Sequence, residues 1–111
     1  MYKDIEIRNS KIHGKGVFAK NFIPKGTLLT CDVLVLNERP LSIKNYFYPW
    51  EGIEHSLCMG FGSYFNHSLT PNVRIKSINK RKLTKTFIIL KDIEVGEELT
   101  IKYSIPNKKW T

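Results

Sequence analysis

The chain has 111 residues, of which 41% are hydrophobic and 25% charged, which is ordinary for one globular domain. Its 18 basic and 10 acidic residues give a formal net charge of +8. No apolar run approaches the roughly 20 residues that span a membrane, and residues 1–4 begin no secretory signal. We therefore expect a single domain over residues 1–111, intracellular and soluble, in the cytoplasm or, for a eukaryotic or viral protein, the nucleus.

Cysteine use argues against a disulfide-stabilised scaffold and against a structural metal site. Cys31 and Cys58 are too few for a disulfide framework and form no metal-type cluster in the sequence. A cytosolic protein keeps such cysteines reduced. We expect no bound metal.

The first elements are short strands joined by a glycine turn. Residues 2–8 alternate, with Ile5 and Ile7 on one face, as a half-buried strand does. Gly14 and Gly16 then form a tight turn that leads into a strand at residues 17–19. This turn is either an ordinary β-turn or a place where the backbone approaches a ligand closely. The dinucleotide-binding fingerprint is excluded, because no third glycine stands in register and no helix follows.

The middle of the chain begins with the most β-prone run, residues 27–36. We expect it to form one strand, or two strands with a kink near Cys31 and Asp32. Residues 42–50 then hold four aromatic side chains and Pro49. Packing in the core is the expectation for at least two of the four aromatic residues. Alternatively, Tyr46 or Tyr48 could present its hydroxyl to a substrate, and the spacing slightly favours Tyr46.

Residues 60–72 read Gly-Phe-Gly-Ser-Tyr-Phe-Asn-His-Ser-Leu-Thr-Pro-Asn. This stretch is polar but flanked by aromatic residues, and it closes on a Pro-Asn turn signature. We expect it to pass through the middle of the molecule with its amides hydrogen-bonded. The alternative is a glycine-rich hairpin loop with a capping asparagine and a surface histidine.

The remaining chain reads as further short strands. We expect a strand at residues 72–78 with Val73 and Ile75 inward, a basic turn at 79–82, and a strand at 84–90. A turn at 92–97 then precedes a last strand at 99–103. Short strands with turns every 8 to 12 residues predict a mainly β protein, here with one or two single helical turns.

A basic surface is expected at residues 76–85. Its charges are Lys76, Lys80, Arg81, Lys82 and Lys85. We favour a solvated turn, because the cluster lacks the interleaved aromatic residues that single-strand binders use. The alternative is weak contact with the phosphates of nucleic acid.

Three ordered segments together resemble one known family. They are Ile-His-Gly-Lys-Gly-Val-Phe-Ala at 12–19, Phe-Asn-His-Ser with Pro-Asn at 65–72, and Gly-Glu-Glu-Leu-Thr-Ile-Lys-Tyr at 96–103. In content, order and spacing they resemble the SET-domain lysine methyltransferases, and the small size resembles the minimal viral and bacterial members. The resemblance implies the SET fold, with small curved sheets around a knot-like crossing of the central motif and the C-terminal segment.

The same resemblance implies an S-adenosylmethionine-dependent protein-lysine N-methyltransferase, acting on a histone or another basic protein. It places Lys15, Gly16 and Val17 in the cofactor pocket. It also implies that Asn66 contacts the methionine amino group of the cofactor and that His67 contacts the adenine.

Aromatic residues complete the implied site. Tyr103 matches the tyrosine whose hydroxyl orients the amine and the transferring methyl, and it also borders the cofactor. Tyr46 is the second candidate catalytic residue, on the substrate side. Trp110 either stacks on the adenine or belongs to a frayed C-terminus.

The sequence departs from the family pattern in three places. Lys102 stands where an acidic residue is common, and residues 73–75 carry no aromatic residue where relatives often have one. Only eight residues follow Tyr103, and a second subunit could supply a missing channel wall, which makes a homodimer one alternative. The other functional hypothesis is a non-catalytic SET-fold module that binds nucleic acid. The intact Gly14, Gly16, Asn66, His67 and Tyr103 favour the enzyme.

Overall fold

The computed structural model describes residues 3–36, 47–50 and 55–102. Within these ranges the chain forms nine strands and one 3-10 turn. In chain order they are β1 (Ile5–Asn9), β2 (Lys15–Ala19), β3 (Leu28–Leu36), β4 (Phe47–Pro49), β5 (His55–Cys58), η2 (Gly60–Ser63), β6 (Asn66–His67), β7 (Val73–Asn79), β8 (Thr84–Ile89) and β9 (Glu98–Ile101). The predicted mainly β class is confirmed.

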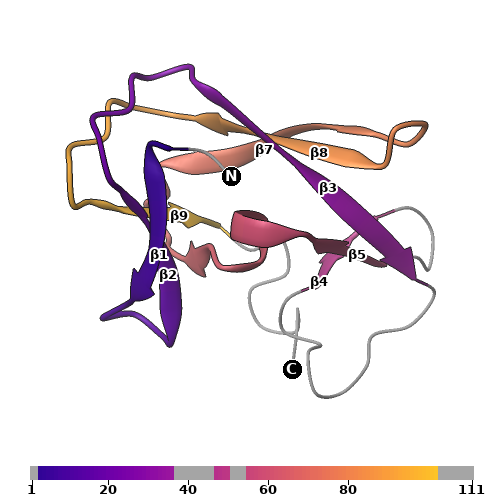
Figure 1. Cartoon of the computed structure of the whole chain (residues 1–111), viewed down its shortest axis with the longest axis horizontal. Helices are drawn as coiled ribbons and strands as arrows, with labels where there is room; N and C mark the ends of the chain where they lie inside the picture. The colour runs from indigo at the N-terminus through magenta and orange to yellow at the C-terminus, as the bar shows by residue number, and fades with distance from the viewer. Residues whose placement is uncertain (1–2, 37–46, 51–54, 103–111) are drawn as a thin grey trace.

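The strands form two sheets, which Figure 1 shows as separate groups on either side of the central segment. The four-stranded sheet has the order β1-β2-β9-β6, and the five-stranded sheet has the order β4-β5-β3-β8-β7. Among the described residues no helix is both long enough and apolar enough to cross a bilayer.

The alternation read in residues 2–8 positions the first hairpin. Ile5 pairs with Ala19 and Ile7 with Val17 across β1 and β2. Because successive residues of a strand point to opposite faces, these four side chains share the face that is turned to the core. Ile5 and Val17 are buried there.

Strand β3 is continuous and changes partners halfway along. Its first half, to Asp32, pairs with β8, and its second half, from Val33, pairs with β5. The chain therefore forms one strand, and the position of the predicted kink is where β3 passes from one partner to the other.

Two expectations about β7 and β8 are wrong. Ile75 is 39% exposed rather than inward, because β7 is an edge strand whose register shifts between Ile75 and Ser77. Lys85, which we assigned to the basic surface, is 1% exposed. It shares the alternating buried face of β8 with Phe87 and Ile89.

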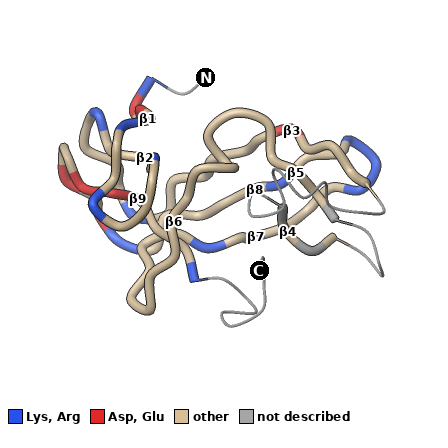
Figure 2. The backbone as a smooth tube through the Cα atoms, turned by 90° about the horizontal axis from the view of Figure 1, so that it is seen from below, with Lys and Arg blue, Asp and Glu red and all other residues tan. Residues whose placement is uncertain are grey.

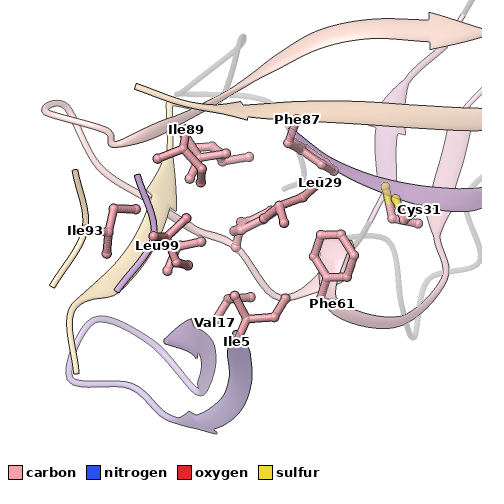
Figure 3. Packing of buried hydrophobic residues seen from close by; sticks show 14 of the residues in the cluster. Ile5, Val17, Leu29, Cys31, Phe61, Phe87, Ile89, Ile93 and Leu99 are labelled. Carbon is pink, nitrogen blue, oxygen red and sulfur yellow. The ribbon is translucent and has the colours of Figure 1, made fainter. Parts of the chain in front are cut away.

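The core lies between the two sheets, and segment 60–72 contributes to it (Figure 3). Phe61 and Phe65 are buried and both contact the ring of Phe87, with the Phe65 and Phe87 centroids 4.8 Å apart. Each buried phenylalanine contributes roughly 1.5–3 kcal/mol through apolar burial alone. Val17 and Leu99 bring the four-stranded sheet into the same cluster.

The central segment lies alongside the last described strand. Asn66 pairs with Thr100 and His67 with Ile101 in a parallel ladder between β6 and β9. The backbone N–H of Ser68 continues the contact by donating to the carbonyl of Ile101 at 2.8 Å. The expectation that this segment passes through the middle of the molecule holds for Phe61, Phe65, Asn66 and Asn72, which are buried, whereas Leu69 and Thr70 are exposed.

Candidate active site

The glycine turn at residues 10–15 forms one edge of the candidate site. Gly14 has φ +47, a conformation that side-chain-bearing residues rarely adopt. The N–H of Ser10 donates to the carbonyl of Gly14 at 2.7 Å and closes the turn. The chain then enters β2 at Lys15, which pairs with Asn9.

Asn66 reaches this turn from the central segment. Its Nδ2 lies 3.1 Å from the carbonyl oxygen of His13, 3.2 Å from that of Lys15, and 2.7 Å from Oε2 of Glu98. The residue is 7% exposed, so its amide is held by three acceptors in a nearly closed environment. Asn66 therefore fixes the carbonyls that flank the glycine turn relative to β9.

Glu98 is the residue at this site to which the sequence reading gave no role. Its carboxylate accepts from Asn66 and also from the Ser10 hydroxyl, at 2.7 Å to Oε1 and 3.0 Å to Oε2. Hydrogen bonds to a charged acceptor are roughly twice as strong as those between neutral groups. The Gly-Glu-Glu run at 96–98 was a usable signal, since a carboxylate next to a buried strand must find donors.

Gly16 permits this arrangement by having no side chain. A Cβ built on Gly16 would lie 2.2 Å from Oε2 of Glu98 and 3.0 Å from Nδ2 of Asn66. The glycine thus gives space to two side chains of the protein itself, where the sequence offered an ordinary β-turn or a close approach to a ligand. Neighbouring Val17 has a fully buried side chain, so its contact with a ligand would be through its main chain.

Asn72 fixes the other end of the central segment. Its Nδ2 donates to the carbonyl of Glu98 at 2.9 Å, and its Oδ1 accepts from the N–H of Thr100 at 2.8 Å. Its own carbonyl accepts from the N–H of Leu90, just after β8. Asn72 therefore joins the strand that carries Glu98 to the second sheet.

A surface hollow adjoins Glu98. It is lined by Arg8, Asn9, Lys11, Phe18, Gly96 and Glu98. The guanidinium carbon of Arg8 lies 4.3 Å from the centroid of the Phe18 ring on this face. The hollow reaches the Glu98 carboxylate from the face of the sheet opposite to Ile5 and Val17.

The structure brings together five of the predicted site residues. Lys15, Gly16 and Val17 lie on β2, and Asn66 and His67 lie on β6, with β9 between these two strands. His67 is half-buried beside Ile101.

The three aromatic candidates, Tyr46, Tyr103 and Trp110, lie outside the described residues. The alternative to Tyr46 is Tyr48, whose hydroxyl donates to the carbonyl of Gly62 at 2.7 Å. Tyr48 is 7% exposed, as expected for an aromatic residue in the core.

Comparison with known proteins places this geometry in a family. The SET domain family matches residues 14–104. The chain is 33% identical over 107 residues to the Schizosaccharomyces pombe histone-lysine N-methyltransferase specific for H3 lysine-37, covering 89% of this chain and 72% of that protein. It is 30% identical over 125 residues to the H3 lysine-9 specific enzyme of the same yeast, covering 90% of this chain but 25% of the longer protein.

A solved structure shows the same fold. The crystal structure of a Plasmodium falciparum candidate histone methyltransferase superposes with a TM-score of 0.78 at 24% identity, covering 95% of this chain and 96% of that one. The family match and the two yeast relatives support lysine methyltransferase activity. With the glycine turn, the Asn-His pair and the Gly-Glu-Glu strand meeting as described, the chain belongs to the SET domain family.

Proposed function

We propose that this protein is an S-adenosylmethionine-dependent protein-lysine N-methyltransferase whose substrate is a histone or another basic protein. The observation that carries the proposal is the contact of Asn66 with the glycine turn and Glu98, which joins all three motif segments at one place. The yeast relatives, named for histone H3 lysines, support the substrate class. On a histone substrate in a eukaryotic or virus-infected cell, the protein would act in the nucleus.

The residues present fit a cationic cofactor. S-adenosylmethionine carries an ammonium and a sulfonium group, and it supplies an activated methyl group when bound. The turn offers the carbonyl oxygens of His13 and Lys15, and the Glu98 carboxylate lies beside them. Acceptors of this kind suit a positively charged group.

We assign the cofactor contacts as follows. The main chain of residues 15–17 would line the pocket, Asn66 would hold the amino-acid end, and His67 would lie beside the adenine. Tyr103 and Trp110 would close the pocket from the C-terminal segment.

For the substrate, the chain has to deprotonate and orient an amine. A free lysine has a pKa near 10.4, and an apolar channel lowers that pKa because it disfavours the ammonium form. The neutral amine must then be held in line at about 3–3.5 Å from the reacting carbon, which is a positioning task. In this proposal the Tyr103 hydroxyl orients the amine, and Tyr46 lies on the substrate side of the channel.

The first test is calorimetric titration of S-adenosylmethionine into the full chain. We expect saturable binding, and at least tenfold weaker binding by Asn66→Ala. Asn79→Ala is the matched control, because Asn79 caps an exposed turn by accepting from the N–H of Lys82. Thermal melting of each variant separates lost binding from lost folding. Absence of binding to the folded wild-type chain would overturn the cofactor assignment.

The second test addresses catalysis with Tyr103→Phe. Removing the hydroxyl should lower turnover on histone H3 by about 10²-fold or more, which is the scale of a lost positioned acid–base group. The affinity for S-adenosylmethionine should change by no more than about twofold, because the ring is kept. Equal turnover by the variant and the wild type would remove Tyr103 from the mechanism.

Nucleic-acid contact is a second candidate function, and one charge pattern favours it. Residues 55–91 contain no aspartate or glutamate. The exposed cations of this stretch are Arg74, Lys76, Lys80, Arg81, Lys82 and Lys91, and Figure 2 shows several of them gathered at the β7–β8 turn. Lys85 contributes nothing to this surface, because it is buried.

Salt dependence tests this surface. If the turn contacts duplex DNA, replacing Lys80, Arg81 and Lys82 by alanine should lower the slope of log affinity against log salt by about 2–3. The matched control replaces the exposed Lys3, Lys20 and Lys25 on other loops. If both triple variants showed the same slope of log affinity against log salt, the binding would depend on the net charge of the protein and not on this turn.

A further inference from the structure

The five-stranded sheet buries a second group of reactive side chains that the proposed transfer does not use. Cys31 on β3 and Cys58 on β5 are free thiols, 6% and 2% exposed. Cys58 pairs with Val33, and Cys31 lies two residues before Val33. Because side chains two residues apart on a strand share a face, both thiols lie on the same buried face of neighbouring strands.

Both sulfur atoms lie against Gly62 of η2. A Cβ built on Gly62 would lie 3.0 Å from Sγ of Cys31 and 3.1 Å from Sγ of Cys58. Hydrogen bonding with Cys58 lowers the pKa of the Cys31 thiol. The same hydrogen bond, together with burial, raises the pKa of the Cys58 thiol.

A buried cation lies beside these thiols. Lys85 pairs with Cys31 across β8 and β3. Its Nζ donates to Ser56 Oγ at 2.9 Å and lies 3.9 Å from the centroid of the Tyr48 ring and 5.9 Å from that of Trp50. Within the described residues it forms no ion pair with a carboxylate. Its positive charge favours the thiolate forms of both cysteines.

We propose that Cys31 and Cys58 form an oxidisable dithiol that closes to a disulfide in response to a hydroperoxide, with Lys85 stabilising the Cys31 thiolate that reacts first. This chemistry is compatible with an intracellular protein, where disulfides that do form are typically transient and redox-sensing. The three observations that carry it are the shared contact of both sulfur atoms with Gly62, the position of both thiols on one buried face of β3 and β5, and the register of Lys85 opposite Cys31.

The proposed steps balance with hydrogen peroxide as the oxidant. The Cys31 thiolate attacks one peroxide oxygen, the O–O bond breaks, and the departing hydroxide takes up a proton to leave as water. The Cys58 sulfur then gives up its proton, attacks the sulfenic acid sulfur of Cys31 and expels hydroxide, which takes up that proton. Two thiols and one peroxide thus give one disulfide and two waters.

Closing this bond would alter the local packing. A disulfide holds its two Cβ atoms about 3.5–4.5 Å apart, which is closer than diagonal neighbours on adjacent strands usually lie. The end of β5 would therefore move toward β3. Gly62, which packs on both sulfurs, and Ser63, whose hydroxyl donates to the carbonyl of Cys58, would move with it.

The test treats the reduced, folded chain with hydrogen peroxide near neutral pH. We expect the intact mass to fall by two hydrogens, peptide mapping without reductant to find Cys31 linked to Cys58, and dithiothreitol to reverse both. In Cys58→Ser, a dimedone adduct should appear on Cys31, because the sulfenic acid has no second thiol to react with. Formation of the disulfide only after unfolding in guanidinium would overturn the proposal.

Lys85→Met tests the role assigned to the cation, with the exposed Lys82→Met on the same hairpin as its matched control. The Lys85 variant should form the disulfide about tenfold more slowly at pH 7, corresponding to a rise of roughly one unit in the pKa of Cys31. Its rate should recover at higher pH, whereas Lys82→Met should behave as the wild type. Equal rates and pH profiles in all three proteins would exclude Lys85 from the reaction.

Discussion

The two sheets stabilise a charged side chain in different ways: Glu98 is half-buried at the edge of a surface hollow, whereas Lys85 is buried. In the four-stranded sheet, the Glu98 carboxylate is surrounded by directed donors from Ser10 and Asn66. In the five-stranded sheet, the Lys85 ammonium has one hydroxyl acceptor, Ser56, and the faces of the aromatic rings of Tyr48 and Trp50.

The hydrogen bonds around Glu98 fix the positions of neighbouring groups, whereas the charge of Lys85 changes the reactivity of the neighbouring thiols. Directed hydrogen bonds fix the carbonyls of the glycine turn, which is what a binding site for a cation requires. Attraction to ring faces depends less on direction and only partly replaces water. Burial accordingly lowers the pKa of Lys85 to about 8.

The largest effect is expected at Asn72, which joins the two sheets. Asn72→Ala leaves the N–H of Thr100 and the carbonyl of Glu98 without their side-chain partner. Each buried unsatisfied group costs about 1–3 kcal/mol, so the free energy of unfolding should fall by about 4 kcal/mol. Urea denaturation followed by tryptophan fluorescence measures this change.

Asn79→Ala is the control for that experiment, because Asn79 is exposed and only caps a turn. Its loss should not exceed about 1 kcal/mol. Equal losses at the two positions would show that Asn72 does not connect the sheets energetically.

A second prediction uses pH to expose the cost of burying Lys85. The pKa of Lys85 falls from 10.5 to about 8 on folding, chiefly by desolvation. Between these values the unfolded chain binds more protons at this residue than the folded chain, so stability increases with pH. The wild type should gain about 3 kcal/mol relative to Lys85→Met between about pH 8 and pH 10.5.

Denaturant unfolding of both proteins across this pH range measures the difference, with Cys31 and Cys58 replaced by serine in both so that the titration of the thiols does not contribute. Lys82→Met should show no such gain relative to the wild type, since Lys82 is exposed. A wild-type curve parallel to that of Lys85→Met would mean that Lys85 keeps an ordinary pKa in the folded state.

The smallest effect is expected at Gly16. In Gly16→Ala the new Cβ would meet Oε2 of Glu98 at 2.2 Å, so the carboxylate must turn away from Ser10 and Asn66. We expect a loss of about 2 kcal/mol, similar to one or two charged hydrogen bonds. Thermal or urea unfolding measures it.

The double variant Gly16→Ala/Glu98→Ala shows whether that contact is the cause. Without the carboxylate the methyl group has room, so the double variant should lose clearly less stability than the sum of the single losses. Additive losses would indicate that Gly16 matters for another reason.

The sequence was sufficient for the elements whose signal is local. Alternation identified β1 and the buried face that carries Ile5, and turn residues marked the ends of most strands. The order of the three motif segments identified the family, and Asn66 was recognised from that order although its acceptors come from distant parts of the chain. These features depend on residues that are neighbours in sequence or on a short motif.

Three features required the tertiary structure. Ile75 has the alternation of an inward residue, but it lies on an edge strand where that face is not covered. Lys85 alternates with Phe87 and Ile89, but its charge suggested solvent, and only the tertiary structure shows that it is buried with its ammonium beside Tyr48 and Ser56.

Glu98 is the third such feature, because its donors lie 88 and 32 residues away in the chain. The two-residue alternation along each strand therefore determined which side chains share a face. Which faces are covered, and which distant groups satisfy a charge, was decided by the assembly of the strands in three dimensions, because burial and hydrogen bonding depend on contacts between segments far apart in sequence.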